Sequence, residues 1–425
     1  MPDLRAPAAL VAAAFAATLA GAAPAPAPEL WIGAWAAAPQ RPFAGPVAHW
    51  RDRTLRLVVH ASAGGRRARV RIANTYGDAP LVIGAARLAR RVREADVDPA
   101  SDRVLAFGGA ASVTIAPGAS ALSDPVDLEV PALSDLAVSL YLPRETAATT
   151  SHALALQTSY VSRAGDASAA ARFPVDARID SWPFLAGVDV LAAGPKASTV
   201  VVFGDSLVDG DGSSPDANRR LSDVLAARLQ AAGANVGVLD EGIIGNRLLR
   251  ASPAGPRNPA GPAFGDAGVD RFERDALAQA GVAAVVVRIG SNDLGLAGTL
   301  APKREMPTLA QLVAGFRGLA ERAHRRGVRI VATTCPPFQD ATIAPGYGAP
   351  AKEPLRRALN AWLLEGGTFD AVVDIDRLLR DPSHPSRLAP AFDSGDHLHP
   401  NDAGYAAIGA AMPLDVLGGA ARPGR

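Results

Sequence analysis

Apolar residues in the second half of the chain form short continuous runs, with longer amphipathic stretches between them. Continuous runs of this length are typical of strands that are buried on both faces of a parallel sheet. The runs occupy residues 200–203, 236–239, 283–289, 330–332 and 372–375. We therefore predict an α/β fold, a doubly wound parallel-sheet domain over residues 196–420, in which helices alternate with these strands.

The strongest helix prediction covers residues 308–326. Its apolar residues recur at spacings of three and four, which places them on one face of a helix. Thr308 and Gln311 match a capping box at its start, and Gly327 is suited to end it. Two further helices are predicted at residues 354–365 and from 401 onward.

Residues 23–195 have a different pattern. Their apolar stretches are short, alternate in part with polar residues, and end at Gly, Pro, Asn or Asp. This is typical of antiparallel strands in a β-sandwich or jelly-roll-like domain. The stretches lie at 55–59, 69–72, 81–83, 112–115 and 136–140. Gly194-Pro195 favours a domain boundary near residue 195.

Aromatic residues of this first domain allow two interpretations. Exposed aromatic rings could stack on a sugar, but aromatic residues of a small β domain lie more often in its core. The residues concerned are Trp31, Trp35, Trp50 and Tyr76. Trp182 and Phe184, close to the boundary, are expected to pack across the interface between the two domains.

The first residues have the pattern of an export signal. Arg5 precedes an apolar stretch at 8–19, and the small residues Ala20-Gly21-Ala22 suit cleavage. We therefore predict a signal peptide at residues 1–22 and a secreted or periplasmic, extracellular protein with no stable membrane insertion after its removal. A retained membrane anchor is the alternative, although the apolar stretch is short for a span.

Composition adds three limits. A chain of 425 residues, 48% of them apolar, can form two cores. A net charge of +1 gives no electrostatic case for binding nucleic acid. The single cysteine, Cys335, cannot form an internal disulfide and is expected to pack as a small apolar side chain.

A serine is the main candidate for chemistry. Ser206 follows the apolar run 200–203, so it is expected at the carboxyl end of a central strand, where open α/β sheets bind their ligands. Gly204 is expected to allow a sharp backbone turn there. A nucleophilic serine needs a base, a group that orients the base, and donors for the oxyanion. Considered alone, Ser206 also fits a helix cap.

His399 and Asp396 are the candidate base and its orienting carboxylate, because three residues of separation in a tight turn can bring both to one side of the chain. His397 and His384 compete for the role of base, and both also suit solvated loops. Asp396, His397 and His399 could instead bind zinc. Since the sequence has no further segment rich in ligands, we predict no metal and no cofactor.

Four separated segments resemble the four blocks of the SGNH (GDSL-type) hydrolase superfamily. They are Phe203-Gly204-Asp205-Ser206-Leu207, Glu241-Gly242-Ile243-Ile244-Gly245-Asn246, Gly290-Ser291-Asn292-Asp293 and Asp396-His397-Leu398-His399-Pro400. The resemblance covers roughly residues 196–415 and implies that Ser206 is the nucleophile, His399 the base and Asp396 its partner. It also implies an oxyanion hole made by the amides of Ser206 and Gly245 and the side chain of Asn292.

The ordinary α/β-hydrolase fold is the competing scaffold, because its acid and histidine also follow the serine. It presents that serine in a Gly-x-Ser-x-Gly turn, which is absent around Ser206. Two positions depart from what is common in SGNH relatives, Asp240-Glu241 before the second block and Arg220-Leu221 where an aromatic is frequent. We expect both to affect structure or substrate preference. Residues 23–195 resemble the β domain that precedes the catalytic domain in some secreted SGNH esterases.

The predicted function is an exported serine esterase that hydrolyses carboxylic esters through an acyl-serine. The favoured substrate is a small-molecule or polysaccharide ester, with short-chain (acetyl) esters of a carbohydrate foremost. Lipolytic, aryl-ester and thioester hydrolysis are alternatives within the same superfamily. A non-catalytic carbohydrate-binding protein on an esterase scaffold is the alternative from another class, and the presence of Ser206, Asn292, Asp396 and His399 argues against it.

Overall fold

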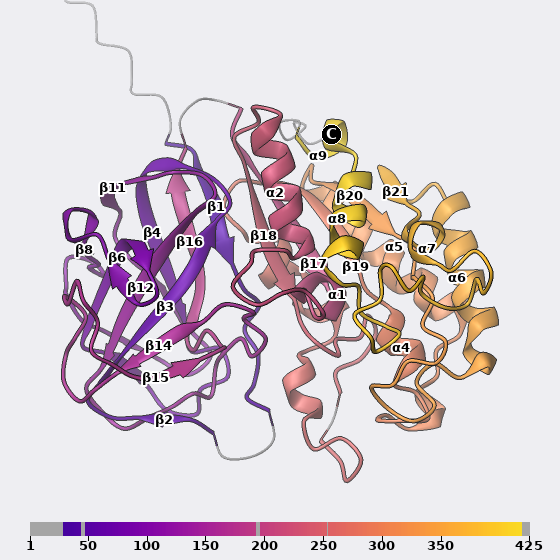
Figure 1. The fold of residues 1–425 in the computed structure, drawn as a ribbon, viewed down its shortest axis with the longest axis horizontal. Coiled ribbons are helices and arrows are strands. Elements are labelled where there is room, and N and C mark those ends of the chain that lie inside the picture. The colour runs from indigo at the N-terminus through magenta and orange to yellow at the C-terminus, as the bar shows by residue number, and fades with distance from the viewer. Residues whose placement is uncertain (1–28, 44–46, 193–195, 253, 419–425) are drawn as a thin grey trace, which may run out of the picture.

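The computed structural model describes residues 29–43, 47–192, 196–252 and 254–418. A β-rich region, indigo to magenta, lies beside an α/β region, and the two are in contact (Figure 1). The prediction of an α/β domain preceded by a β-rich domain is therefore confirmed. The predicted signal peptide at 1–22 and the expected boundary at 195 lie outside the described residues.

Two antiparallel sheets form most of the β-rich domain in the described part of the chain. The first has the order β1 (Trp31–Ala36), β16 (Leu185–Leu191), β4 (Gly65–Ala73) and β10 (Ser120–Leu122), with β11 (Val126–Val130) also paired to β4. The second has the order β15 (Val175–Ile179), β14 (Ser159–Ser162), β3 (Arg53–Ala61), β12 (Ser134–Leu142), β6 (Ala85–Arg93) and β7 (Asp96–Val97), with β8 (Arg103–Val104) on β6. Two short ribbons pair β13 (Thr146–Ala147) with β2 (His49–Trp50) and β5 (Leu81–Ile83) with β9 (Val113–Ile115).

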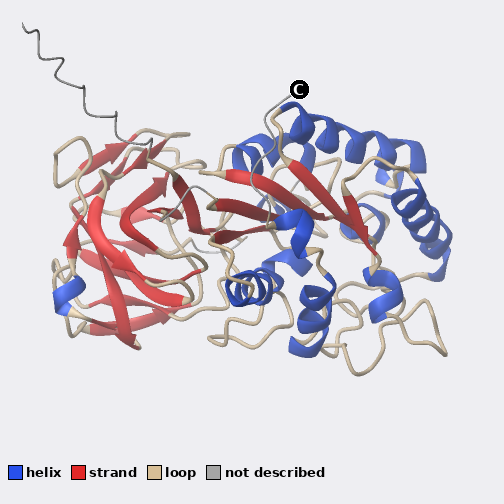
Figure 2. Cartoon of the chain, turned by 90° about the horizontal axis from the view of Figure 1, so that it is seen from above, coloured by secondary structure: helices blue, strands red, loops and turns tan. Residues whose placement is uncertain are grey.

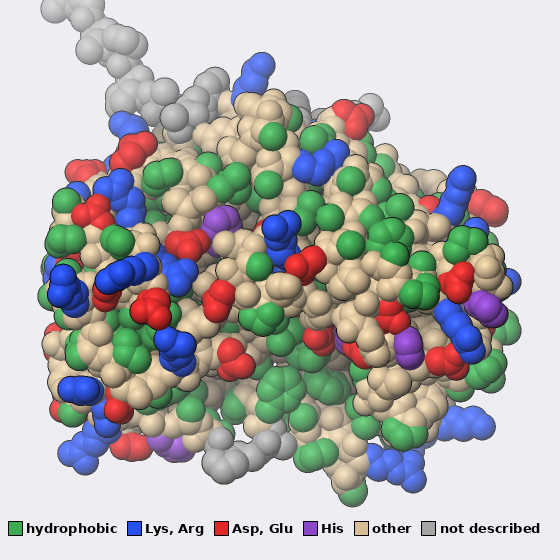
Figure 3. All heavy atoms as spheres, viewed as in Figure 1, with side chains coloured by type: hydrophobic (Ala, Val, Ile, Leu, Met, Phe, Trp, Pro, Cys, Tyr) green, Lys and Arg blue, Asp and Glu red, His purple; other side chains and the backbone are tan. Residues whose placement is uncertain are grey.

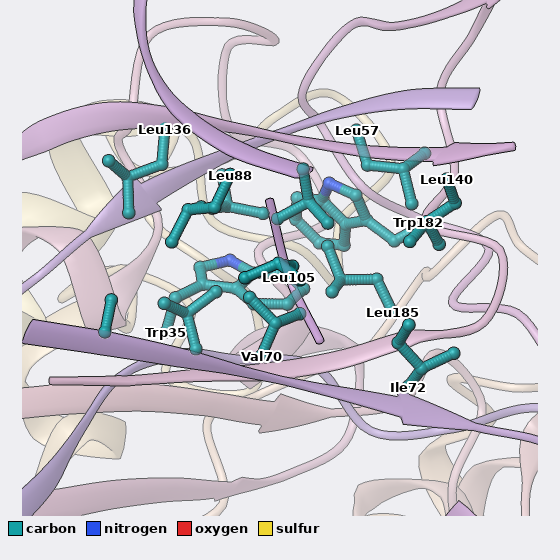
Figure 4. Packing of buried hydrophobic residues seen from close by; sticks show 14 of the residues in the cluster. Trp35, Leu57, Val70, Ile72, Leu88, Leu105, Leu136, Leu140, Trp182 and Leu185 are labelled. Carbon is teal, nitrogen blue, oxygen red and sulfur yellow. The ribbon is translucent and has the colours of Figure 1, made fainter. Parts of the chain in front are cut away.

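The core of the β-rich domain lies between its two large sheets. Figure 4 shows leucines of β3, β6 and β12 above, and Val70 and Ile72 of β4 below, with two indole rings between them. Trp35 and Trp182 meet edge to face at 4.8 Å between ring centroids. The Trp182 indole N–H donates to the Val58 carbonyl at 2.8 Å, which satisfies its polar atom inside the core.

This core settles the interpretation for one of the four aromatic residues, Trp35. Of the four suggested for sugar stacking, Trp35 is buried and the other three are partly buried. Trp182 and Phe184, which were expected to pack across the interface, both belong to the core between the sheets. The α/β domain reaches the Trp182 ring with the Arg220 guanidinium, 5.4 Å from the ring centroid.

Five strands of the described chain form the sheet of the α/β domain. Their order is β18 (Val236–Gly242), β17 (Ser198–Gly204), β19 (Val282–Arg288), β20 (Arg329–Thr333) and β21 (Ala371–Val373), and each neighbouring pair is parallel. Alternate side chains of β17 enter different cores. Val200 and Val202 pack with α2 (Leu221–Ala231) and α8 (Asp402–Ala411), whereas Val201 and Phe203 pack with α3 (Gly268–Phe272), α5 (Leu309–Arg325) and α6 (Glu353–Glu365).

Helices therefore cover both faces of this sheet, as Figure 2 shows from above. They are α1 (Ser206–Asp209), α2 (Leu221–Ala231), α3 (Gly268–Phe272), α4 (Ser291–Gly295), α5 (Leu309–Arg325), α6 (Glu353–Glu365), α7 (Ile375–Leu379), α8 (Asp402–Ala411) and α9 (Leu414–Leu417). A π-helical segment, Glu273–Leu277, continues α3, and 3-10 turns lie at Pro99–Ser101, Gly261–Phe264, Lys303–Glu305 and Pro350–Lys352.

The helix predictions are confirmed with small shifts. The capping box at the start of α5 is formed, with the Gln311 amide donating to Thr308 Oγ1 at 3.2 Å and the Thr308 amide donating to Gln311 Oε1 at 2.9 Å. Asn401 caps α8. The strand expected at 372–375 ends at Val373, because Asp374 accepts the Arg377 amide and starts α7.

The surface seen in Figure 3 intersperses acidic and basic side chains over both domains. A mixed surface of this kind offers no concentrated basic face on the side shown, which agrees with the net charge of +1. Among the described residues, no helix is long and apolar enough to cross a bilayer.

Candidate active site

Ser206 begins α1 directly after β17, at the carboxyl edge of the parallel sheet. Since β18 and β19, the next strands along the chain, flank β17 on opposite sides, this edge is a topological switch point, where such sheets bind ligands. Gly204 has a different role from the one expected. Its φ is not in the left-handed region, and a Cβ there would stand 1.8 Å from the Arg288 carbonyl oxygen. The glycine therefore permits close packing of β17 on β19.

The structure brings Ser206, His399 and Asp396 into one hydrogen-bonded chain. Ser206 Oγ lies 2.8 Å from His399 Nε2, and His399 Nδ1 lies 2.5 Å from Asp396 Oδ2. The other Asp396 oxygen accepts the amides of Leu398 at 2.9 Å and His399 at 2.8 Å. Because the carboxylate is held by the backbone of its own loop, it fixes the orientation of the imidazole ring.

The two competing histidines lie elsewhere. His397 is half exposed, has a φ of 63°, and pairs with Asp393 at 2.5 Å. His384 is exposed and pairs with Asp381 at 3.3 Å. The His397 ring is hydrogen-bonded to Asp393 and to neither Asp396 nor His399, and no group of three or more potential metal ligands occurs among the described residues.

Charges around His399 set its proton affinity. Burial lowers the pKa of His399, but the hydrogen bond to Asp396 and the nearby carboxylates outweigh burial, so its pKa lies above the ordinary value for histidine. Burial raises the pKa of Asp396, yet the bond from His399 and two backbone amides hold that pKa far below its ordinary value. At neutral pH Asp396 is therefore ionised and stabilises a protonated imidazole.

Asp211 is a second carboxylate at this ring that the sequence did not reveal. Its Oδ2 lies 3.6 Å from His399 Nε2, the nitrogen that faces Ser206. The Tyr405 hydroxyl donates to the Asp211 carbonyl at 2.7 Å, and the Asp211 amide donates to the Ser206 carbonyl at 3.0 Å. Asp211 is thereby fixed between the nucleophile helix and α8.

Gly245 and Ser206 both present backbone amides without a hydrogen-bond acceptor among the described residues. Gly245 has a φ of 73°, in the region that favours glycine, and a Cβ there would stand 2.5 Å from the Phe264 ring. Glycine is thus required at this position for two independent reasons. An unpaired amide that the backbone holds in place is suited to receive an anion.

Asn292 is held by both ends of its side-chain amide. Its Nδ2 donates to the Asn246 carbonyl at 3.0 Å, and its Oδ1 accepts the Tyr347 hydroxyl at 2.9 Å. A carboxamide nitrogen carries two protons, so one N–H is left beyond the bond to Asn246. The Tyr347 bond fixes which way the amide points, and sequence reasoning had not identified that tyrosine.

Buried charges connect the blocks behind the site. Arg288 donates to Asp205 at 3.3 Å and to Ser291 Oγ at 2.6 Å, which joins the first block to the third. Cys335 Sγ lies 3.0 Å from the same Ser291 oxygen, and burial raises the pKa of its thiol. Cys335 thus lies in the core as expected and is kept as a neutral thiol.

The positions that depart from the common SGNH pattern have structural contacts. Asp240 accepts the Ser222 hydroxyl at 2.6 Å and the Gly242 amide at 3.1 Å, and burial raises its pKa to about 7. Glu241 is buried, with one oxygen accepting the Gln279 amide at 2.8 Å. Asp240 therefore ties α2 to β18, and Glu241 packs beneath the second block.

An α/β domain with a serine, a histidine and an aspartate joined at the carboxyl edge of its sheet has the architecture of a serine hydrolase. Residues 202–407 match the model of the GDSL-like lipase/acylhydrolase family. This region is therefore a GDSL-like lipase/acylhydrolase domain, and the chain is a carboxylic ester hydrolase. None of the curated proteins compared with the chain matches it.

Solved structures similar to part of the chain include three esterases. A putative arylesterase from Agrobacterium tumefaciens is 21% identical, with 52% of this chain and 98% of that chain covered and a TM-score of 0.38. A carbohydrate acetylesterase from Sinorhizobium meliloti is 16% identical, with 52% and 98% covered and a TM-score of 0.38. An acetyl xylan esterase from Geobacillus stearothermophilus is 20% identical, with 54% and 100% covered and a TM-score of 0.36. The family assignment rests on residues 202–407 alone.

Proposed function

We propose that this ester hydrolase acts through Ser206 as nucleophile, His399 as general base and Asp396 as the group that orients and stabilises His399. The observation that carries the proposal is the hydrogen-bonded chain from Ser206 Oγ to His399 and on to Asp396, at 2.8 and 2.5 Å. Ser206 lies at the carboxyl edge of the parallel sheet, and the Ser206 and Gly245 amides have no acceptor among the described residues. A base, its orienter and oxyanion donors are what a serine nucleophile requires.

In the first step His399 Nε2 takes the proton of Ser206 as its oxygen attacks the ester carbonyl. Negative charge develops on the carbonyl oxygen, and the amides of Ser206 and Gly245 and the free Asn292 N–H receive it. The protonated His399 then gives its proton to the alcohol oxygen as the ester bond breaks. Asp396 and Asp211 both face the ring at this stage and stabilise its positive charge.

In the second step a water molecule replaces the alcohol. His399, again neutral, takes a proton from the water as it attacks the acyl-serine carbonyl, and the same donors receive the oxyanion. His399 then returns the proton to Ser206 Oγ as the carboxylic acid leaves. These residues complete the cycle with no metal and no cofactor.

We further propose that the substrates are short-chain, foremost acetyl, esters of a carbohydrate. The Phe264 ring stands directly against Gly245, which supports a restricted space beside the proposed oxyanion site. The predicted export and the β domain that precedes the catalytic domain also favour an ester of a saccharide.

The test is hydrolysis of p-nitrophenyl esters of increasing acyl length, with Ser206→Ala as the blank. We expect kcat/KM to be highest for acetate and to fall steeply beyond it, and acetate release from an acetylated polysaccharide to exceed hydrolysis of a long-chain triglyceride. A rate that rises with chain length would replace the carbohydrate proposal by a lipolytic enzyme. Equal rates in wild type and Ser206→Ala would refute the proposed nucleophile.

Asn292→Ala is expected to lower kcat about 10²–10³-fold, which is the usual cost of losing one oxyanion donor. KM should change little, because the donor acts mainly on charge that forms in the transition state. Steady-state kinetics on a small acetate ester measures both constants. A kcat within threefold of wild type would exclude Asn292 from the oxyanion hole.

Asp211→Asn is expected to move the acid limb of the kcat/KM profile to lower pH. Only neutral His399 can accept the serine proton, and the Asp211 carboxylate is one of the charges that raise the pKa of His399. Without that charge, His399 stays neutral to a lower pH. The measurement is kcat/KM for a small acetate ester from pH 5 to 9.

Asp127→Asn is the matched control for this shift, since it removes the same charge from a strongly exposed side chain of the β domain, 91% accessible. Its acid limb should coincide with that of the wild type. An unmoved or raised limb in Asp211→Asn would show that the Asp211 charge does not act on His399.

We propose export as well, on the pattern of Arg5, the apolar stretch 8–19 and the small residues at 20–22. Expression with its own amino terminus, followed by mass measurement of the protein outside the inner membrane, tests this. Cleavage near residue 22 is expected. A full-length protein retained in the membrane fraction would favour the anchor instead.

A further inference from the structure

We propose that His152, a residue of the β domain, is a positioning residue of the active site. Its ion pair with Asp209 fixes the position of the loop that carries the Gly245 amide relative to Ser206. The inference rests on the proposed function, because it assigns the Gly245 amide to the oxyanion hole. It gives the β domain a part in catalysis that neither the family match nor the four sequence blocks assign to it.

His152 is anchored firmly on the β domain. Its backbone amide donates to the Trp182 carbonyl at 3.1 Å, and the Trp182 amide donates back to the His152 carbonyl at 2.9 Å. The imidazole is 3% exposed and lies tilted against the Trp182 indole, with 5.6 Å between ring centroids. Since Trp182 belongs to the core between the two sheets, the position of the ring is set by that core.

Both ring nitrogens of His152 face acceptors. Nδ1 lies 2.9 Å from the Ala38 carbonyl oxygen and Nε2 lies 2.9 Å from Asp209 Oδ1. A carbonyl oxygen and a carboxylate oxygen both accept hydrogen bonds, so the geometry suits an imidazole that carries protons on both nitrogens. Burial lowers the pKa of His152, but the charge and hydrogen bond of Asp209, the Ala38 carbonyl and the Asp240 charge together outweigh burial, and the pKa lies above its ordinary value. The pair is therefore a buried imidazolium and carboxylate that join the two domains.

Asp209 connects His152 to the two segments that carry Ser206 and Gly245. It is the last residue of α1, which begins at Ser206. Its second oxygen, Oδ2, accepts the Ile244 amide at 2.8 Å, and Ile244 directly precedes Gly245. A Cβ on Gly242 would stand 2.1 Å from the Asp209 amide nitrogen, so the two segments touch backbone to backbone. One carboxylate thus joins the β domain, the nucleophile helix and the oxyanion loop.

A second contact between the domains supports the same role for the β domain. The Asp216 carboxylate accepts the Thr158 amide and hydroxyl, each at 2.6 Å. From the same loop, Ser214 donates twice to the Asp402 carboxylate at 2.8 Å, at the start of the helix that follows His399. The β domain is therefore connected to the nucleophile side and to the base side of the site.

The test compares His152→Ala and His152→Gln in the full-length protein. Misplacement of one oxyanion donor by about 1 Å costs on the order of 10²-fold, so His152→Ala should lose about 10²-fold in kcat while KM stays within threefold. Glutamine can still donate to Asp209, and His152→Gln should recover at least tenfold of that loss. His49→Ala, at a partly exposed histidine of the same domain paired with Glu145, is the matched control and should keep the wild-type kcat.

Three results would overturn the inference: a folded His152→Ala with wild-type kcat, a loss confined to KM, or no recovery in His152→Gln. If neither variant folds, nitrogen-15 spectra of histidine in the wild type decide, because the ion pair requires both His152 ring nitrogens to be protonated at the pH of the assay. A neutral ring would overturn the inference. Its failure is separate from that of the proposed function, since Ser206→Ala would still abolish hydrolysis.

Discussion

His399→Ala is expected to lower kcat for a small acetate ester about 10⁶-fold, which is the size of effect measured when the histidine or serine of such a triad is removed. The reason is geometric, because Nε2 is the group positioned 2.8 Å from Ser206 Oγ to accept its proton. KM should change far less than kcat, since the imidazole accepts the proton in the transition state and does not bind the substrate. The rates are measured with short assays for the wild type and overnight assays for the variant.

His397→Ala is the matched control, because it removes the same side chain two residues away. His397 is half exposed and pairs with Asp393, not with Ser206 or Asp396. Its removal should leave kcat within a few-fold of wild type. A large loss in His397→Ala with little loss in His399→Ala would exchange the two roles and contradict the proposed base.

Arg271→Met is expected to destabilise the protein by about 3–5 kcal/mol, because several buried oxygen atoms lose their hydrogen-bond donor and the buried Asp275 carboxylate keeps only Arg274 as its partner. The Arg271 side chain is fully buried. It donates to the carbonyls of Gly204 at 2.6 Å and Glu241 at 3.0 Å, where β17 and β18 end. It also donates to Asn246 Oδ1 at 3.0 Å and Asp275 Oδ2 at 3.1 Å.

Thermal unfolding measures this effect, and a loss of that size corresponds to a decrease of roughly 10 °C in Tm. Arg250→Met is the control, since Arg250 is exposed and has no hydrogen bond or ion pair among the described residues. It should shift stability by less than about 0.5 kcal/mol. Equal Tm values for the two variants would show that Arg271 does not hold the ends of β17 and β18 together.

Local patterns predicted most elements of the fold, because their causes are local. The apolar run before Ser206 and the capping box at Thr308 depend on residues a few positions apart, and both elements form where expected. The strand expected at 372–375 was too long by two residues, since hydropathy does not distinguish Ile375 in a strand from Ile375 at the start of a helix. The capping oxygen of Asp374 decides that point.

Packing across long sequence distances could not be predicted in the same way. Gly204 was assigned to a turn, but the Arg288 carbonyl, 84 positions further along, is what excludes a side chain there. Because Trp182 is close to the domain boundary in the sequence, it is predicted to lie at the interface. Its partner Trp35 belongs to the first strand of the same domain, far away in the sequence. Such pairings are fixed by the sheet order, which hydropathy does not encode.

The candidate site shows the same division. Ser206, Asp396, His399, Gly245 and Asn292 were identified because each lies in a short block, and the structure brings the first three into contact. Asp211 follows the first block by only four positions, but its approach to His399 depends on the course of two loops. His152 belongs to no block, and its proposed role depends on a contact with Asp209 of the other domain.

The central claim is that Ser206 becomes acylated, and covalent labelling tests it most directly. Wild-type protein is treated with a fluorophosphonate, which traps an activated serine, and the modified peptide is identified by mass spectrometry. The account predicts one adduct, on Ser206, that appears together with loss of esterase activity and is absent from Ser206→Ala and strongly slowed in His399→Ala. An adduct on another residue that abolishes activity, or full inactivation of Ser206→Ala by the same reagent, would contradict it.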